Sequence, residues 1–208
     1  MNNMINGLMQ KINRLPPSVK ALSFWDIDDT LFKMKDAHIY IISKEEKKII
    51  KKMPSSEFAN YTPKYNEIVD FYDYRDSHRF FHNTEPLKAN LEKAKEELES
   101  GNSMVVILTA RGDMNNKELF LKRFQMCGLD MKKPHIHVSR SGNLGLGVAA
   151  GKMQVVQECL NTKRFNCINM FDDSRMNLTE FLKLKKDYPT YDFNAFLANN
   201  GILETFNR

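Results

Sequence analysis

Acidic side chains directly after a short apolar run are the first residues in this sequence whose types and spacing can do chemistry. Residues 21–32 read A-L-S-F-W-D-I-D-D-T-L-F. The apolar run predicts a buried strand that delivers Asp26 and Asp28 to its carboxyl end. Alternation along an extended segment points both carboxylates the same way, with Ile27 in the core between them. Two unpaired carboxylates so close together predict a bound divalent cation, a shared proton, or both.

Other polar residues stand at the ends of later apolar runs. Thr109 ends a β-branched run, Asp172 and Asp173 end another, and Lys152 opens the helix expected before the second run. The carboxyl ends of parallel strands share one edge of a sheet, so these groups should converge. Together they predict a site for a hard cation such as Mg²⁺, with phosphate oxygens as further ligands. The alternative for the first run is a capped turn whose acids only satisfy backbone donors.

Strands and helices alternate along most of the chain. The predicted strands are 21–25, 104–109, 136–139 and 167–171, with an edge strand at 191–193. The predicted helices lie within residues 1–20, 86–101, 120–128, 151–163 and 178–182. Such alternation predicts an α/β fold, a Rossmann-like and mostly parallel sheet with helices on both faces. Residues 33–85 break the rhythm, so we expect a core of residues 1–32 and 86–208 with a small insertion at 33–85.

The insertion carries two features that bear on partners. Between residues 33 and 64, eight basic residues face four acidic ones, which would attract a phosphorylated or polyanionic substrate or simply solvate a helix face. Its aromatic-rich run, residues 61–81, either packs a small core of its own or stacks on bases. Arg79 and its basic neighbours either reach over the site to hold a substrate or solvate the surface of the insertion.

Composition narrows the class of protein. The chain has 208 residues, 42% hydrophobic and 27% charged, with a net charge of +5, which is typical of a single-domain globular protein with at most a modest insertion. It has no apolar run of membrane-spanning length and no signal-peptide pattern, so we expect a cytoplasmic protein. The three cysteines have no C-x-x-C spacing, so we expect no disulfide and no zinc-thiolate site.

The four motifs resemble those of the haloacid dehalogenase (HAD) superfamily of aspartate-nucleophile phosphohydrolases. D-I-D-D-T at residues 26–30 matches the first motif, D-x-D-x-T, and L-T-A at 108–110 is similar to the second. Lys152 fits the third motif, and the acid pair at 172–173 fits the fourth. The resemblance implies a HAD-like core and makes residues 33–85 similar to a small C1-type cap. The strings R-D-S-H, I-L-T-A-R-G-D and F-D-D-S-R-M-N also resemble small HAD proteins of tailed bacteriophages, for which the compartment would be the host cytoplasm.

The resemblance also implies a role for each motif residue. Asp26 would be the nucleophile that forms an aspartyl-phosphate, and Asp28 the general acid and then base. Thr109 would bind a phosphoryl oxygen, and Lys152 would neutralise charge on the nucleophile and the phosphoryl group. The metal ligands would be Asp26, the backbone carbonyl of Asp28, and the fourth-motif acids. Of these acids, Asp173 would contact Mg²⁺ directly and Asp172 would support it; which of the two touches the metal stays open.

The expected function is a Mg²⁺-dependent phosphatase acting on a nucleotide or on the phosphorylated end of a nucleic acid. Two alternatives stay open: a phosphate- or nucleic-acid-binding module without catalysis, and a response-regulator receiver domain. The intact acid set argues against the first, and the placement of D-x-D-x-T on one strand argues against the second. The sequence gives no oligomeric state.

Several residues are weaker candidates. Arg111 and Arg140, just past strand ends, have the geometry to bind phosphate through two nitrogens. His135 and His137 share one face of a strand, a spacing compatible with zinc but without an evident third ligand. A glycine-rich segment at 142–147 is expected to be a flexible connection. Asn177 stands where many HAD relatives carry a second acid, and its amide would orient a metal-bound water.

Overall fold

The structure, a computed structural model, describes residues 3–58 and 61–207. Residues 1–2 and 208 of the predicted core and residues 59–60 of the predicted insertion lie outside the described residues.

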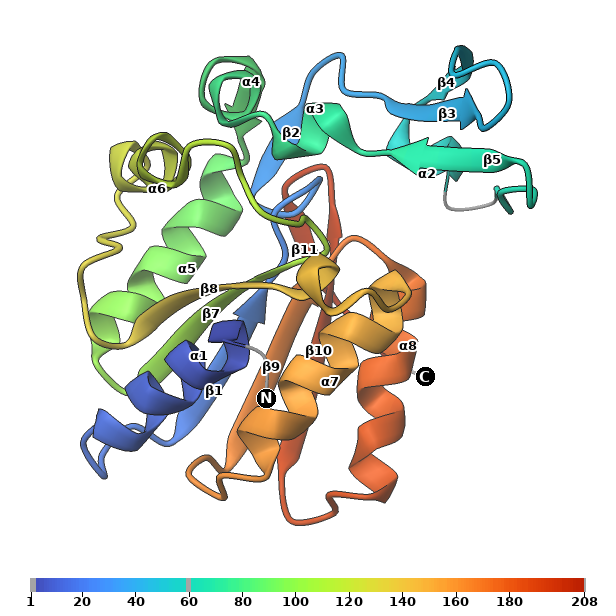
Figure 1. Cartoon of the computed structure of the whole chain (residues 1–208). Coiled ribbons are helices and arrows are strands. Elements are labelled where there is room, and N and C mark those ends of the chain that lie inside the picture. Colours follow the sequence, from blue (N-terminus) through green and yellow to red (C-terminus); the bar gives the residue numbers. More distant parts are fainter. Residues whose placement is uncertain (1–2, 59–60, 208) are drawn as a thin grey trace.

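A six-stranded sheet forms the centre of the molecule (Figure 1). Its strands are β1 (Ala21–Trp25), β7 (Ser103–Thr109), β8 (Ile136–Arg140), β9 (Cys167–Asp172), β10 (Asp192–Asn199) and β11 (Ile202–Thr205). Their spatial order is β11-β10-β9-β1-β7-β8; all neighbours pair in parallel except β10 and β11. The prediction of a mostly parallel α/β sheet is confirmed.

Helices cover both faces of this sheet. They are α1 (Asn3–Arg14), α5 (Lys88–Ser100), α6 (Lys117–Met126), α7 (Val148–Leu160) and α8 (Arg175–Lys183), with short 3₁₀ turns η1 (Ser141–Leu144) and η2 (Leu184–Lys186). Helices α1, α7 and α8 lie on one face, and α5 and α6 lie on the other (Figure 1). The sequence accounts for the end of α5, because Gly101 adopts a left-handed φ of 69° that favours glycine.

Two large hydrophobic clusters fill the space between the sheet and its helices. All seven residues of β7 are buried, as its β-branched composition predicts for a strand covered on both faces. One cluster lies under α1, α7 and α8, where Leu8 and Ile12 of α1 are fully buried. The N-terminal helix therefore packs on the core, as its apolar spacing predicts. The other cluster lies under α5 and α6 and includes Phe124.

The segment after β1 forms a second, smaller layer of structure. Its elements are β2 (Phe32–Met34), β3 (Ile39–Ser43), β4 (Ile49–Met53), α2 (Ser55–Phe58), β5 (Glu67–Asp70), α3 (Tyr72–Arg75), α4 (Ser77–Asn83) and β6 (Thr84–Pro86). Strands β4, β3 and β5 form an antiparallel sheet with its own small core of Ile39, Ile41 and Met53. Figure 1 shows this sheet above the carboxyl-terminal edge of the central sheet. Helix α4 instead packs on α6, and Phe80 belongs to the core cluster under α5 and α6.

Several predicted boundaries differ from the structure. The strand expected at 191–193 is the first part of β10, an eight-residue interior strand, and the sheet edge is formed by β11, which the sequence reasoning missed. Helix α7 begins at Val148, three residues before the expected start. Pro86 ends β6 instead of opening α5.

In the described part of the chain, no helix is long and apolar enough to cross a membrane.

Candidate active site

The central position of β1 brings three strand ends together. Strand β1 pairs with β7 on one side and with β9 on the other, and Trp25 lies in register with Ile107 and Phe171. The next residue, Asp26, continues the pairing by donating its backbone N–H to the Phe171 carbonyl over 3.0 Å. The predicted convergence of Asp26, Thr109 and Asp172 at one edge therefore follows from the strand order.

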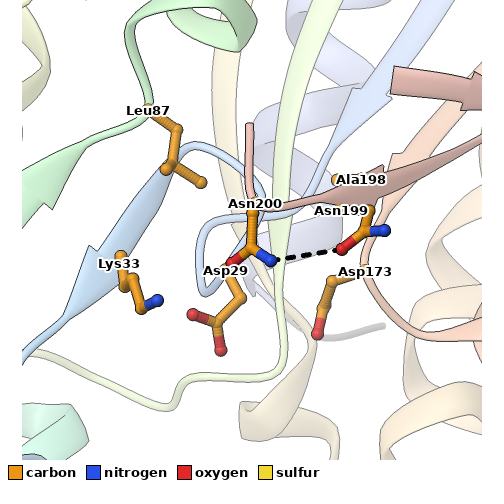
Figure 2. Close-up of a pocket in the computed structure, with 7 residues that line it drawn as sticks. All are labelled: Asp29, Lys33, Leu87, Asp173, Ala198, Asn199 and Asn200. Carbon is orange, nitrogen blue, oxygen red and sulfur yellow. Dashed lines mark hydrogen bonds between the residues drawn. The ribbon is translucent and has the colours of Figure 1, made fainter. Parts of the chain in front are cut away.

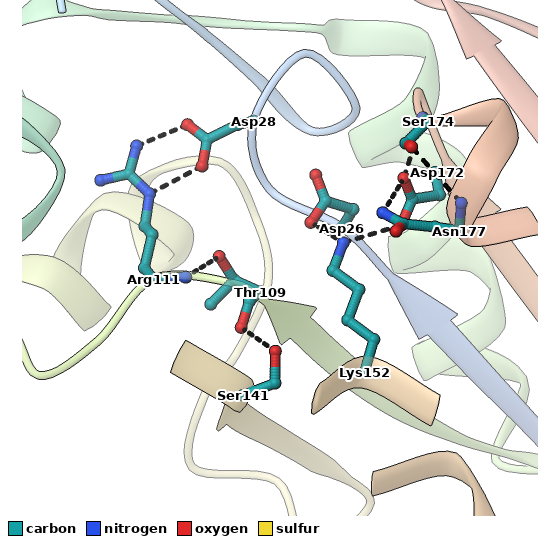
Figure 3. Close-up of polar contacts among 9 residues, drawn as sticks. All are labelled: Asp26, Asp28, Thr109, Arg111, Ser141, Lys152, Asp172, Ser174 and Asn177. Atoms are coloured by element: carbon teal, nitrogen blue, oxygen red, sulfur yellow. Dashed lines mark hydrogen bonds and ion pairs between the residues drawn. The ribbon is translucent and has the colours of Figure 1, made fainter. Parts of the chain in front are cut away.

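Lys152 joins two of these strand ends (Figure 3). Its ammonium donates to Asp26 Oδ1 over 2.5 Å and to Asp172 Oδ2 over 2.7 Å. The lysine is 2% exposed and reaches the sheet edge from the first part of α7. Desolvation alone would lower its pKa, but the Asp172 and Asp26 carboxylates raise the pKa of Lys152 above its ordinary value. The lysine is therefore a permanent cation at this site.

Asp172 is fully buried and surrounded by donors. Besides Lys152, the Asn177 amide donates to both of its oxygens, over 2.9 and 3.1 Å, and the Ser174 backbone N–H donates to Oδ1. Ser174 also caps α8 by accepting the N–H of Asn177. In the structure the Asn177 amide nitrogen therefore holds Asp172, and its expected role toward a metal-bound water stays a prediction.

Asp26, Asp172 and Asp173 form a group of acids that fits a metal ion. Each offers one carboxylate oxygen, and these oxygens lie within 4.8 Å of one another. With all three ionised and only Lys152 beside them, the group carries an excess of two negative charges. Oxygen ligands and an uncompensated double charge suit a hard divalent cation.

The pKa values of these acids reflect the same excess of charge. Desolvation raises the pKa of Asp26 well above its ordinary value. The Lys152 ammonium opposes this shift, and the neighbouring carboxylates add to it. Desolvation and the Asp172 carboxylate raise the pKa of Asp173 to about 7. Asp173 is the exposed member of the group, so it is the acid that solvent or a ligand reaches. Without a cation, protons take up part of the excess charge.

Asp28 has a different partner from Asp26. Arg111 Nε donates to Asp28 Oδ2 over 2.8 Å and Nη2 donates to Oδ1 over 2.5 Å, so the two side chains form a two-pronged ion pair (Figure 3). The prediction that Asp26 and Asp28 are two unpaired carboxylates is therefore wrong, because each is paired with its own cation. Ile27 between them is buried, as predicted.

Thr109 lies at the end of β7 and is almost fully buried. Its hydroxyl accepts the Arg111 backbone N–H over 3.1 Å, and its carbonyl accepts the Ser141 hydroxyl over 3.0 Å. The first residues of the glycine-rich segment form η1 beside Thr109, and residues 145–147 connect it to α7. A Cβ on Gly142 would lie 2.2 Å from the Ala110 carbonyl oxygen, so only glycine allows this approach.

A pocket of about 230 Å³ opens beside the acids (Figure 2). Its walls are Asp29, Lys33, Leu87, Asp173, Ala198, Asn199 and Asn200. Asp173 belongs both to this pocket and to the group of acids, so the pocket adjoins the predicted metal ligands. Five of these seven residues are polar, and the wall is built from the β1–β2 segment, the β9–α8 connection and the end of β10 with its turn.

The remaining predicted residues lie in other surroundings. Arg79 donates to the Asp36 carbonyl and lies 3.5 Å from Asp73 Oδ1, so the structure places its guanidinium on groups of the inserted segment. Arg140 pairs with Asp113 over 2.9 Å. His135 lies 2.7 Å from the Leu98 carbonyl, outside β8. In the described part of the chain, neither histidine belongs to a group of potential metal ligands.

Comparisons with protein-family models, with curated proteins and with solved structures find no match.

Three supporting contacts were not predicted from the sequence. They are the hydrogen bonds of Ser141 and of Ser174, and the ion pair of Arg111 with Asp28. A signal existed for Ser174, because a serine three residues before Asn177 in a helix start is typical of an N-cap. The contacts of Ser141 and Arg111 depend on segments 32 and 83 residues away along the chain, and spacing alone did not indicate them.

Proposed function

We propose that this protein is a Mg²⁺-dependent phosphomonoester hydrolase of HAD type, acting through an aspartyl-phosphate on a nucleotide or on the end phosphate of a nucleic acid. The observation that carries the proposal is the group of Asp26, Asp172, Asp173 and Lys152 at one edge of a parallel sheet. An anionic nucleophile and an anionic substrate repel each other, and a lysine beside a cation-binding acid group offsets that repulsion.

Each residue of the site has a role in this proposal. Asp26 and Asp173 would hold Mg²⁺, which supplies charge neutralisation for the phosphoryl group, while Lys152 and Asn177 keep Asp172 in place behind them. The Asp26 carboxylate attacks phosphorus, forming a new P–O bond as the bond to the leaving oxygen breaks. Asp28, after one of its oxygens has left Arg111 and taken up a proton from solvent, donates that proton to the leaving oxygen.

The second step restores the protein. Water attacks the phosphorus, Asp28 takes its proton, and the bond between phosphorus and the Asp26 oxygen breaks to release inorganic phosphate. Because Arg111 holds both oxygens of Asp28 in this structure, one oxygen must turn from Arg111 to the leaving group. Thr109 and Lys152 bind phosphoryl oxygens in both steps.

The inserted layer fits the role of a small cap. The sheet formed by β4, β3 and β5 lies over the edge where the acids converge (Figure 1). Arg79 and Arg111, both expected to bind substrate, are engaged with protein groups here, as are Lys152 and Thr109. Lys152 and Thr109 stay the proposed phosphate contacts because they lie at the strand edge beside Asp26.

Phosphate release from a panel of substrates tests the proposal. The panel contains p-nitrophenyl phosphate, mononucleotides, sugar phosphates and 3′- or 5′-phosphorylated oligonucleotides, each with Mg²⁺ or EDTA. Asp26→Asn is the test variant. Asp187→Asn, an exposed aspartate at the end of η2, is the matched control.

Turnover that needs both Mg²⁺ and Asp26, and that survives in Asp187→Asn, supports the proposal. A folded protein that releases no phosphate from any substrate contradicts it and favours the binding module without catalysis. Activity that persists in Asp26→Asn contradicts the assigned nucleophile.

A further inference from the structure

The hairpin of β3 and β4 carries a dense group of positive charges away from the acids. Five lysines lie within residues 44–52, together with Glu45 and Glu46. These lysines are Lys44, Lys47, Lys48, Lys51 and Lys52, and all five are exposed. The turn is tight: the Ser43 N–H donates to the Lys48 carbonyl and the Lys47 N–H donates to the Ser43 carbonyl. The charges are therefore held on one ordered element.

The acids of the neighbouring strands are occupied by other groups. Glu57 pairs with Lys51 over 2.7 Å, and Asp70 pairs with Arg75 over 2.5 Å. Glu67 accepts the Tyr61 hydroxyl and the Lys64 N–H. Within residues 3–58 and 61–207, no carboxylate forms an ion pair with the other four hairpin lysines. The Lys44 ammonium instead donates to the Tyr65 carbonyl, and the Lys52 ammonium lies 5.6 Å from the centre of the Tyr40 ring. Counted against Glu45 and Glu46 in the same turn, these four lysines leave an excess of two positive charges for an external anion.

An exposed aromatic residue lies on the loop that contacts the start of this hairpin. Tyr65 is 88% exposed, and the Lys44 ammonium donates to its backbone carbonyl. This contact holds the loop that carries the ring against the start of the hairpin, where the Lys44 N–H also donates to the Asn66 carbonyl. An exposed aromatic ring on a loop held against a lysine-rich hairpin suits a nucleic acid, because the ring can stack on a base while the lysines bind phosphates. We call Lys44, Lys47, Lys48, Lys52 and Tyr65 the hairpin patch.

We propose that the hairpin patch binds single-stranded nucleic acid. Lys48 directly precedes β4 and Lys52 is its fourth residue. An extended chain rises about 3.3 Å per residue, so their backbones lie up to about 13 Å apart, a span that successive phosphates of one strand can cover. The link to catalysis rests on the proposed function: a strand held here, above the carboxyl-terminal edge of the central sheet (Figure 1), presents its phosphorylated end to the acids.

A membrane surface is the other polyanion to consider. Membrane-binding segments bury a continuous apolar face among their basic residues. The exposed apolar residues of this hairpin are only Ile49 and Ile50, at an irregularity of the β3–β4 pairing. The combination of an exposed tyrosine and separated lysines favours nucleic acid.

Fluorescence anisotropy of a labelled single-stranded oligonucleotide tests this inference. The full chain carries Asp26→Asn, so that binding is measured without turnover, and salt is varied. The test variants are Lys48→Glu with Lys52→Glu, and Tyr65→Ala. The control is Lys185→Glu with Lys186→Glu, which makes the same charge change at exposed positions of η2.

We expect the Lys48 and Lys52 double variant to bind at least tenfold more weakly. Its slope of log affinity against log salt should be smaller by about 1.4, because each lost phosphate contact removes about 0.7. Tyr65→Ala should bind the oligonucleotide about fivefold or more weakly. The affinity of the control should fall by less than twofold. Thermal melting checks that every variant is folded.

Equal weakening in the control and the test variants would overturn the inference, as would a parent protein that does not bind the oligonucleotide. Sedimentation with vesicles of anionic lipid, in the absence of oligonucleotide binding, would assign the patch to membranes and overturn it as well. Binding that depends on the patch without any phosphate release in the substrate panel would instead leave the inference standing and contradict the proposed function.

Discussion

Arg111 and Asp28 form a two-pronged ion pair in which the guanidinium is 2% exposed. The same guanidinium donates to the Tyr74 carbonyl over 2.9 Å and lies 4.9 Å from the centre of the Phe80 ring. Arg111 therefore joins the first acidic motif to the inserted segment, and among residues 3–58 and 61–207 its ion-pair partner is Asp28. Arg111 is therefore a positioning residue for Asp28.

Replacing Arg111 should therefore affect both stability and turnover. Arg111→Lys keeps the charge but loses the paired geometry and the ring contacts. We expect it to lower the free energy of unfolding by about 2 kcal/mol, less than for a fully buried pair because Asp28 retains some contact with solvent. Phosphate release should fall in kcat more than it rises in KM. Urea unfolding and steady-state kinetics measure these effects, and unchanged kcat in a destabilised variant would leave Arg111 with a structural role only.

Metal binding should depend on Asp173 and on pH. Because desolvation raises the pKa of Asp173 to about 7, protons compete with a cation below that pH, so the apparent affinity for Mg²⁺ should rise from pH 6 to pH 8. Titration calorimetry with Mg²⁺ measures it. Asp173→Asn should abolish the binding heat and Asp187→Asn should keep it. An affinity that is equal at both pH values would contradict this assignment.

Gly142 should be essential to the shape of the site. A Cβ there would meet the Ala110 carbonyl oxygen at 2.2 Å, so Gly142→Ala must displace the segment between Thr109 and Arg111. We expect a loss of about 2–3 kcal/mol in the free energy of unfolding together with a loss of phosphate release. Gly147→Ala is the matched control, because its Cβ would have nothing within 4 Å; it should cost less than about 1 kcal/mol. Equal unfolding midpoints for the two variants would contradict the close approach.

His137 should make stability depend on pH. Desolvation, with Lys11, Lys117 and Arg140 nearby, lowers the pKa of His137 to about 4. Between pH 6.5 and 4 the unfolded chain binds a proton at this histidine that the folded protein does not. Its contribution to stability is therefore complete above pH 6.5 and is lost as the pH falls to about 4.

The measurement for His137 is urea unfolding at pH 7.5 and pH 5. On acidification, the free energy of unfolding should fall by up to about 2 kcal/mol less in His137→Gln than in the parent. The exposed His82, changed to glutamine, serves as the control and should behave like the parent. A parent and a His137 variant with the same loss would contradict the prediction.

The positions of the strand ends at the site could be predicted from the local sequence. β-branched runs such as the one ending in Thr109 are typical of buried parallel strands, and parallel strands must end at one edge. The convergence of Asp26, Thr109, Lys152 and Asp172 could therefore be predicted without coordinates. Strand β10 was underestimated because polar residues such as Asn194, on its exposed face, interrupt the apolar signal.

Partners that come from distant segments could not be predicted in this way. Asp28 and Arg111 are 83 residues apart, and the arginine is directed to the acid by packing against Tyr74 and Phe80. Spacing along the chain indicates which residues reach the edge of the sheet, but side-chain packing decides which cation each acid receives. The same limit applies to Asn177, whose partner depends on how α8 follows β9.

The central claim is phosphoryl transfer to Asp26, and acid quenching of the reaction followed by peptide mass spectrometry tests it most directly. The experiment uses the Asp28→Asn variant with Mg²⁺ and p-nitrophenyl phosphate. The p-nitrophenolate group departs without a proton from Asp28, whereas loss of the general base should slow hydrolysis of the covalent intermediate. We expect a phosphoryl group on the peptide that contains Asp26, absent in EDTA and absent when Asp26 is also changed to asparagine. Phosphate release by the parent protein with no phosphorylated peptide under any quench condition, or a phosphoryl group on another residue, would contradict it.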